Sequence, residues 1–384
     1  NIISAATTNS LGNDAGMVAY LGSDTGWVKS EGAIVSSGDG AIGNGDIVSI
    51  RLDLDAGTPT IKFYKNDGLL YSHNLSATQD PAQTGKPLFA AVGDVDLANG
   101  TTFKSDFGQL GFTYSLPADH SALHTANMPT PTIPDPEEHH QVELVNHDGT
   151  STAGTCSFDL DDYEWLCIIK NRDNIENWYT INSLVGVDEI MHINVSDVEA
   201  TDANVLTVSG TTYTLGSTLL ADNYIVEFHK AGLAAATASD EAGSINTTST
   251  SFNATSGFFM SLYTGTGANA TVGTGLSTPV EFLVSKCRND NTGAGEGHWH
   301  SYHIGTASDA ETDYMRLNTT AGAVDDATAW QDTVPGNEVF SIGTYAGVNV
   351  SSNLYFSFGW YSVPGYSAFG SYEGNSSTDG CMIN

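Results

Sequence analysis

Hydrophobic and polar residues alternate along much of this chain with the period of two that is typical of β-strands, and helical periodicity is hard to find. Clusters of Gly, Asn and Asp bound the alternating runs roughly every eight to twelve residues, a spacing typical of sandwiches and barrels. Two runs, 47–52 and 60–65, predict neighbouring strands, and Asn66-Asp67-Gly68 predicts a reversal into a third strand at 69–71. The pattern therefore predicts an all-β protein made of antiparallel β-sandwiches.

Prolines divide the chain into two parts. Pro129, Pro131, Pro134 and Pro136 lie close together and are followed by Glu137-Glu138-His139-His140. Because proline fixes φ and lacks an amide hydrogen, this density predicts a stiff, extended segment that cannot be a central strand. We therefore predict a first domain at 1–128 and a linker at 129–140.

Beyond the linker the sequence repeats itself, at a spacing too long for a propeller blade or a solenoid turn but long enough for a domain. The repetition predicts a first β-repeat at 141–256, a second at 257–366 and the start of a truncated third at 367–384. Four pairs of segments carry the match: 144–149 with 262–267, 167–172 with 283–288, 190–194 with 314–318, and 213–216 with 340–343.

The charge of the chain narrows the classes of partner. Acidic residues outnumber basic ones by 45 to 12, which gives a net charge of −33. Binding to nucleic acid or to anionic lipid needs clustered Lys and Arg, so both are excluded. The hydrophobic content of 40% predicts folded domains rather than an acidic disordered tail. No stretch approaches the ~18 apolar residues of a membrane-spanning helix, so we expect no membrane insertion.

A series of ordered motifs runs along the first domain, at 45–55, 63–68, 88–93, 107–109, 112–114 and 123–129. Together these motifs resemble the second half of a SPRY domain, in the version found in bacteriophage structural proteins. The later repeats, with their Tyr-Thr-Gly-type openings and a strand end of Lys-Asn/Cys-Arg, are similar to the module that often follows it in phage tail and fibre proteins. The first strands of a SPRY fold would lie before Asn1, so we expect the chain to be part of a longer protein.

This resemblance implies a concanavalin-like β-sandwich that binds protein or glycan through loops at one edge, without catalysis. It predicts a virion structural protein, either a tail fibre or another exposed component at the virion surface, and therefore an extracellular location. The implied partners are other virion proteins and a host surface glycan or protein, and the chain is expected to form a homo-oligomer. Two alternatives stay open: a carbohydrate-acting enzyme on a sandwich scaffold, and a cellular surface adhesin or filament protein.

One histidine cluster has the composition of a metal site. His298 and His300 share one face of a predicted strand, whereas His303 points to the other face. Imidazole suits transition metals such as zinc and nickel, so His298 and His300 are the candidate ligands for a divalent cation. The alternative is a pair of surface histidines without an ion, and no other cofactor is expected.

The remaining catalytic signals are weak, and we predict no catalytic residues. Gly38–Gly43 satisfies GxGxxG, but a strand follows it where a dinucleotide site needs a helix, so it predicts a turn. The four cysteines form no CxxC pair. Paired carboxylates predict solvated turns, although a glycosidase would need two of them about 5 to 10 Å apart. These pairs are Asp53/Asp55, Asp94/Asp96, Asp159/Asp161 and Asp325/Asp326.

Loop aromatics are the remaining candidates for ligand contact, because such rings stack on sugars and anchor partner surfaces. The two tryptophans Trp178 and Trp299 fall in corresponding stretches of the repeats, which favours a shared structural role as the alternative. The candidates are Trp27, Trp178, Tyr179, Trp299 and Tyr302.

Overall fold

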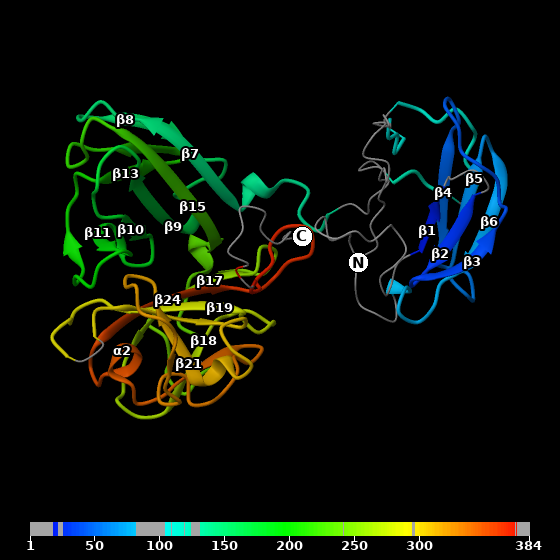
Figure 1. The fold of residues 1–384 in the computed structure, drawn as a ribbon. Coiled ribbons are helices and arrows are strands. Elements are labelled where there is room, and N and C mark those ends of the chain that lie inside the picture. Colours follow the sequence, from blue (N-terminus) through cyan, green and yellow to red (C-terminus); the bar gives the residue numbers. More distant parts are fainter. Residues whose placement is uncertain are drawn as a thin grey trace. The chain divides into compact units, whose positions relative to one another are not determined.

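The computed structural model describes residues 18–21, 26–81, 104–108, 110–118, 120–123, 131–240, 242–293, 296–372 and 374. The chain forms two compact units, 1–129 and 130–384. Paired strands in the described residues run antiparallel in several sheets, so the predicted all-β sandwich class is confirmed (Figure 1). None of the helices in these residues has the length and apolar character needed to cross a membrane.

The first unit contains two three-stranded sheets, in the orders β1-β2-β3 and β4-β5-β6. Asn66 and Asp67 form the two-residue turn between β5 and β6, both with positive φ, as a type I′ hairpin turn requires. Val28 and Phe63 are the most buried apolar side chains described in this unit. The bounds are β1 Val18–Leu21, β2 Trp27–Ser30, β3 Ala33–Ser37, β4 Val48–Asp53, β5 Thr60–Lys65 and β6 Gly68–Asn74.

The second unit begins with a sandwich that we call the first lobe. A six-stranded sheet, β12-β11-β10-β9-β15-β7, packs on a three-stranded sheet, β13-β14-β8. Trp165, Tyr213 and Phe228 are buried in the core between them. The bounds are β7 His140–Asn146, β8 Thr152–Thr155, β9 Tyr163–Asn171, β10 Tyr179–Asn182, β11 Gly186–His192, β12 Ala200–Thr201, β13 Leu206–Ser209, β14 Thr212–Leu215 and β15 Asn223–Leu233, with short 3-10 helices at Pro136–Glu138 and Ala234–Ala236.

A second sandwich, the second lobe, follows. Its seven-stranded sheet has the order β16-β17-β24-β19-β20-β21-β22 and faces a two-stranded sheet, β18-β23. Tyr263 stacks on Tyr355 in the core between them, with ring centroids 5.0 Å apart. The bounds are β16 Ser249–Asn253, β17 Phe258–Thr264, β18 Ala270–Gly273, β19 Phe282–Cys287, β20 Trp299–His303, β21 Asp313–Arg316, β22 Val324–Asp325, β23 Val339–Ile342 and β24 Leu354–Trp360, with a 3-10 turn at Ala310–Thr312 and helix α2 at Ala346–Asn349.

The two lobes share a strand order. In each lobe a central strand, β9 or β19, lies between the next strand in the chain and the last strand of the lobe. The matched segments 167–172 and 283–288 lie on these central strands, and 190–194 and 314–318 lie on β11 and β21 and the residues after them. Strand β16 pairs with β17, so the second lobe takes residues from before the predicted boundary at 257. Most of the predicted third repeat, 367–384, lies outside the described residues.

The larger sheets of the two lobes pack against each other through their outer faces. Strand β15 alternates, so that Tyr224, Val226 and Phe228 enter the first lobe's core, whereas Ala231 faces the second lobe. A separate apolar core lies between the two lobes. It contains Leu166, Met191 and Ala231 from the first lobe and Phe258, Met260, Leu262, Val284, Trp299, Phe356 and Phe358 from the second. The lobes therefore form one body by burying a shared apolar surface, which we call the lobe interface.

Polar contacts also join the lobes, and two of them involve side chains at the lobe interface. The Trp299 indole Nε1 donates to the His192 carbonyl oxygen at 2.8 Å, so a buried donor is satisfied across the lobes. Arg288 donates from its Nε and Nη2 atoms to the two carboxylate oxygens of Glu199, at 2.7 and 2.8 Å. A bidentate pair of this kind fixes orientation as well as attraction, so these contacts set how the two sheets are aligned.

Phe358→Ala tests the lobe interface. Deleting this buried ring leaves a cavity, so we expect the free energy of unfolding to fall by about 3 to 5 kcal/mol. Leu144→Ala is the matched control, because Leu144 is an exposed residue on the outer face of the first lobe's sheet, and its cost should stay within about 0.5 kcal/mol. Denaturant unfolding followed by tryptophan fluorescence measures both values, and equal costs would contradict the interface.

Candidate functional site

The second lobe covers only part of the first lobe's outer face. On the remainder, Leu144 pairs with Ile225, and Ile225 pairs with Lys170, whose Nζ lies 5.6 Å from the ring centre of Trp178. Leu144 is 65% exposed and Trp178 is 40% exposed. With Val142, which is also exposed, these five residues form an apolar surface with one cation, which we call the open face.

The second lobe repeats the lysine and tryptophan of the open face in a buried setting. Lys286 pairs with Trp299 on adjacent strands, and its Nζ lies 5.9 Å from that indole ring. Both residues are fully buried, and the Lys286 ammonium group donates to the Gly297 carbonyl oxygen. Burial lowers the pKa of Lys286 to about 8, because a charged ammonium group loses hydration there. The same pair of residue types is therefore internal in one lobe and a surface feature in the other.

Beside the open face, three potential metal ligands converge. His140 begins β7, and Glu227 and His229 lie on one face of β15. The Nε2 atoms of His140 and His229 lie 2.8 and 3.0 Å from the same oxygen of Glu227, Oε1. The two imidazole rings stack with centroids 4.5 Å apart. We call these three residues the histidine–carboxylate cluster.

Hydrogen bonding and burial shift the pKa values of two members of this cluster, Glu227 and His229. Hydrogen bonds from the two imidazoles hold the pKa of Glu227 far below its ordinary value, so its carboxylate is ionised. Burial lowers the pKa of His229, which favours its neutral form. The cluster therefore offers an anionic oxygen beside a neutral imidazole nitrogen, the forms in which these groups bind metals.

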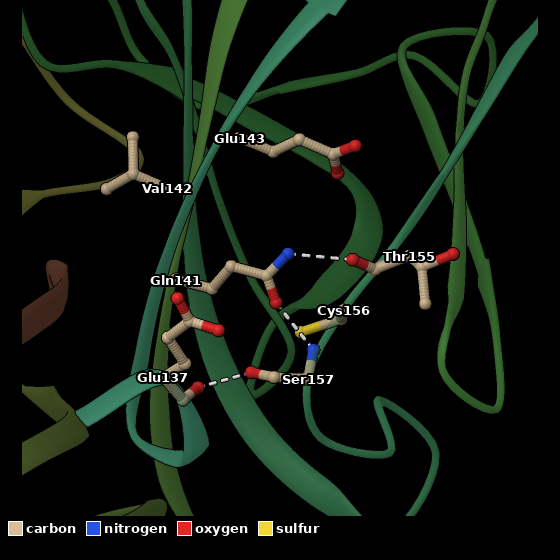
Figure 2. A pocket seen from close by; sticks show the side chains of 7 residues that line it. All are labelled: Glu137, Gln141, Val142, Glu143, Thr155, Cys156 and Ser157. Carbon is tan, nitrogen blue, oxygen red and sulfur yellow. Dashed lines mark hydrogen bonds between the residues drawn. The ribbon is translucent and has the colours of Figure 1, made fainter. Parts of the chain in front are cut away.

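A hollow of about 370 Å³ lies on the other side of β7, between β7 and the residues that follow β8 (Figure 2). Gln141 crosses it: its Nε2 donates to the Thr155 carbonyl at 2.7 Å, and its Oε1 accepts from the Ser157 amide. The Ser157 hydroxyl donates to the Glu137 carbonyl. Burial raises the pKa of the Cys156 thiol, so the one sulfur in the lining is a poor nucleophile at neutral pH.

The structure does not assemble a metal site around His298 and His300. Their rings are perpendicular, with centroids 6.1 Å apart, and His298 Nδ1 lies 3.0 Å from the Asn318 amide nitrogen. His300 is fully buried and its Nε2 contacts the Tyr345 hydroxyl at 3.3 Å. Burial and then Arg316 lower its pKa to about 3. Among the described residues, only the histidine–carboxylate cluster brings three potential ligands together.

The candidate aromatics divide by burial. Trp178 lies on the open face, and Trp27, on β2 of the first unit, is 39% exposed. Tyr179 is half-buried and packs against the first lobe's core. Trp299 and Tyr302 were predicted as ligand contacts, but they are 0% and 2% exposed, because Trp299 fills the lobe interface and Tyr302 fills the second lobe's core.

The carboxylate pairs that the structure describes bind backbone amides. Asp53 Oδ1 accepts from the amides of Asp55 and Ala56, and Asp159 Oδ1 accepts from those of Asp161 and Asp162. This is the turn role expected of Asp. Asp326 Oδ1 accepts a hydrogen bond from the Thr328 amide in the same way. Asp94 and Asp96 lie outside the described residues. Gly38–Gly43 lies in the connection between β3 and β4.

Sequence reasoning missed the histidine–carboxylate cluster. Its local signal is the Glu227-Phe228-His229 spacing, which puts two ligands on one strand face. The third ligand, His140, arrives through the register of β7 against β15, in which His140 pairs with His229. No local motif encodes a pairing between residues so far apart in the chain.

A family model described as Domain of unknown function (DUF7483) matches residues 166–384, which is more than half of the chain. The matched stretch begins within β9 and contains the lobe interface, Glu227 and His229. No curated protein and no solved structure matches the chain.

Lys286→Met tests the buried lysine. The unfolded chain holds this proton up to about pH 10.5, whereas the folded chain releases it at about pH 8. Between these values the unfolded state binds more protons, so wild-type stability gains with rising pH, by about 3 kcal/mol in total. Denaturant titrations measure the free energy of unfolding of the wild type and of Lys286→Met at each pH. The wild-type value minus the variant value should rise by about 3 kcal/mol between pH 8 and pH 10.5. Lys170→Met is the matched control, and a rise shared by both variants would contradict the burial argument.

Proposed function

The chain belongs to the DUF7483 family of domains of unknown function, and we propose that it is a non-enzymatic structural and binding protein of a virus particle. The role that we assign is that of a tail fibre or another exposed component that takes part in host attachment or assembly. Its partners are other virion proteins or a host surface glycan or protein.

The observation that carries the proposal is the arrangement of the second unit. Two sandwiches share a buried core, and the Glu199–Arg288 pair and the Trp299–His192 hydrogen bond add directional contacts across it. Such a body resists bending between the lobes, because any hinge motion would expose the shared apolar surface to water. Rigid β-domains in series suit a spacer that presents a binding surface at a distance.

The open face supplies a binding surface on that body. Exposed apolar groups beside an aromatic ring mark protein or ligand contacts more often than scattered surface residues do. Trp178 offers an indole that stacks on sugar rings or anchors a protein partner. Lys170 adds the one positive charge of this surface in a strongly acidic protein. The open face therefore combines an apolar anchor with a group that orients an anionic or polar partner.

Particle association tests the proposed role. Antibodies raised against the recombinant chain should label the exterior of particles purified from cells that produce this chain, as seen by immunogold electron microscopy. If the antibodies recognise the chain in the cell lysate but do not label the particles, the proposal is overturned.

Trp178→Ala tests the open face. Soluble recombinant chain should compete with particles for adsorption to host cells, and Trp178→Ala should weaken this competition by about tenfold or more, as expected for loss of a central aromatic anchor. Val334→Ala is the matched control, because Val334 is a similarly exposed apolar residue in the second lobe. Equal competition by the two variants would contradict a role for the open face in attachment.

A further inference from the structure

We propose that His140, Glu227 and His229 form a binding site for one divalent transition-metal ion, with Zn²⁺ as the ion that fits best. The site is independent of the proposed virion role. It also differs in place and residues from the His298 and His300 pair that the sequence suggested.

The spacing of the ligand atoms carries the proposal. His140, Glu227 and His229 each offer one ligand atom within 4.8 Å of the other two, and the Nε2 atoms of His140 and His229 lie 2.8 and 3.0 Å from Glu227 Oε1. Zinc binds imidazole nitrogen and carboxylate oxygen at about 2.0 to 2.2 Å, so two ligand atoms on a tetrahedral zinc lie about 3.3 Å apart. Small side-chain rotations therefore turn this arrangement into three corners of a tetrahedron.

The backbone holds these side chains in place. Glu227 and His229 are two residues apart on β15, and His140 is the direct partner of His229 across the β7–β15 ladder. The His229 ring also packs against Phe258 and Trp360 of the second lobe, with ring centroids 5.5 and 5.3 Å away. Because strand pairing and ring packing fix the positions before an ion arrives, little ordering is needed on binding.

Two His and one carboxylate are a donor set that proteins use for zinc and other transition metals. All three side chains keep partial exposure to solvent, so an ion can enter and a water molecule can take the fourth position. Binding places both imidazole protons on Nδ1, which frees each Nε2 lone pair for the metal. The negative charge of the whole chain raises the local concentration of cations.

The competing structural role is a metal-free hydrogen-bonded trio, in which both imidazoles donate to one carboxylate oxygen. Calorimetric titration of chelator-treated full chain with Zn²⁺ separates the two. If the site binds zinc, the wild type should bind one more ion per chain than Glu227→Gln does, or the variant should bind the ion with an affinity at least about tenfold lower. Co²⁺ should give visible absorption bands of four-coordinate geometry in the wild type that Glu227→Gln lacks.

Controls keep the result decisive. His298→Gln should bind like the wild type, and loss of the ion in that variant alone would return the site to the His298 and His300 pair and overturn the proposal. No difference between wild type and Glu227→Gln would also overturn it. If thermal melts in chelator show that Glu227→Gln does not fold, His140→Gln, on the edge strand β7, replaces it with the same expected loss.

Discussion

The fold of the second unit depends on burial of the second lobe's large sheet on both faces. One face packs on that lobe's own core and the other packs on the first lobe. This explains why Phe258–Thr264 and Leu354–Trp360 are almost continuous apolar runs, whereas Asn223–Leu233 alternates. A strand between two buried faces has no polar side to show, while a strand with one partly open face keeps its alternation.

The second lobe covers only part of the first lobe's outer face, so equivalent side chains of the two lobes lie in different environments. Lys286 and Trp299 are sealed inside the lobe interface, and the equivalent Lys170 and Trp178 remain at the surface. The local sequence is similar in both copies, so their environment decides between an internal packing role and an accessible one. Trp178 is consequently the repeat tryptophan that is open to solvent, and Trp299 is the one that packs between the lobes.

Local patterns predicted the elements well, and they failed where distant segments meet. Alternation and the Asn66-Asp67 turn placed β4, β5 and β6 to within a few residues, because turn chemistry and period are written locally. His300 looked like a surface ligand because no local pattern shows that α2, beginning at Ala346, closes over it: a Cβ on Gly347 would lie 2.4 Å from its ring. The histidine–carboxylate cluster was invisible for the same reason, since it needs the β7–β15 register and the second lobe's aromatics.

The position of the histidine–carboxylate cluster links it to the lobe interface. His140 belongs to the edge strand that follows the proline-rich segment, and Glu227 and His229 belong to the neighbouring strand β15. Phe258 and Trp360 of the other lobe pack against the His229 ring. Loosening the lobes would release the His229 ring and so spread the three ligand atoms apart. Gln141, the residue after His140, points to the opposite side of β7, into the hollow that it crosses. Ion affinity at the cluster and cohesion of the lobes are therefore coupled, because both depend on the packing of one ring.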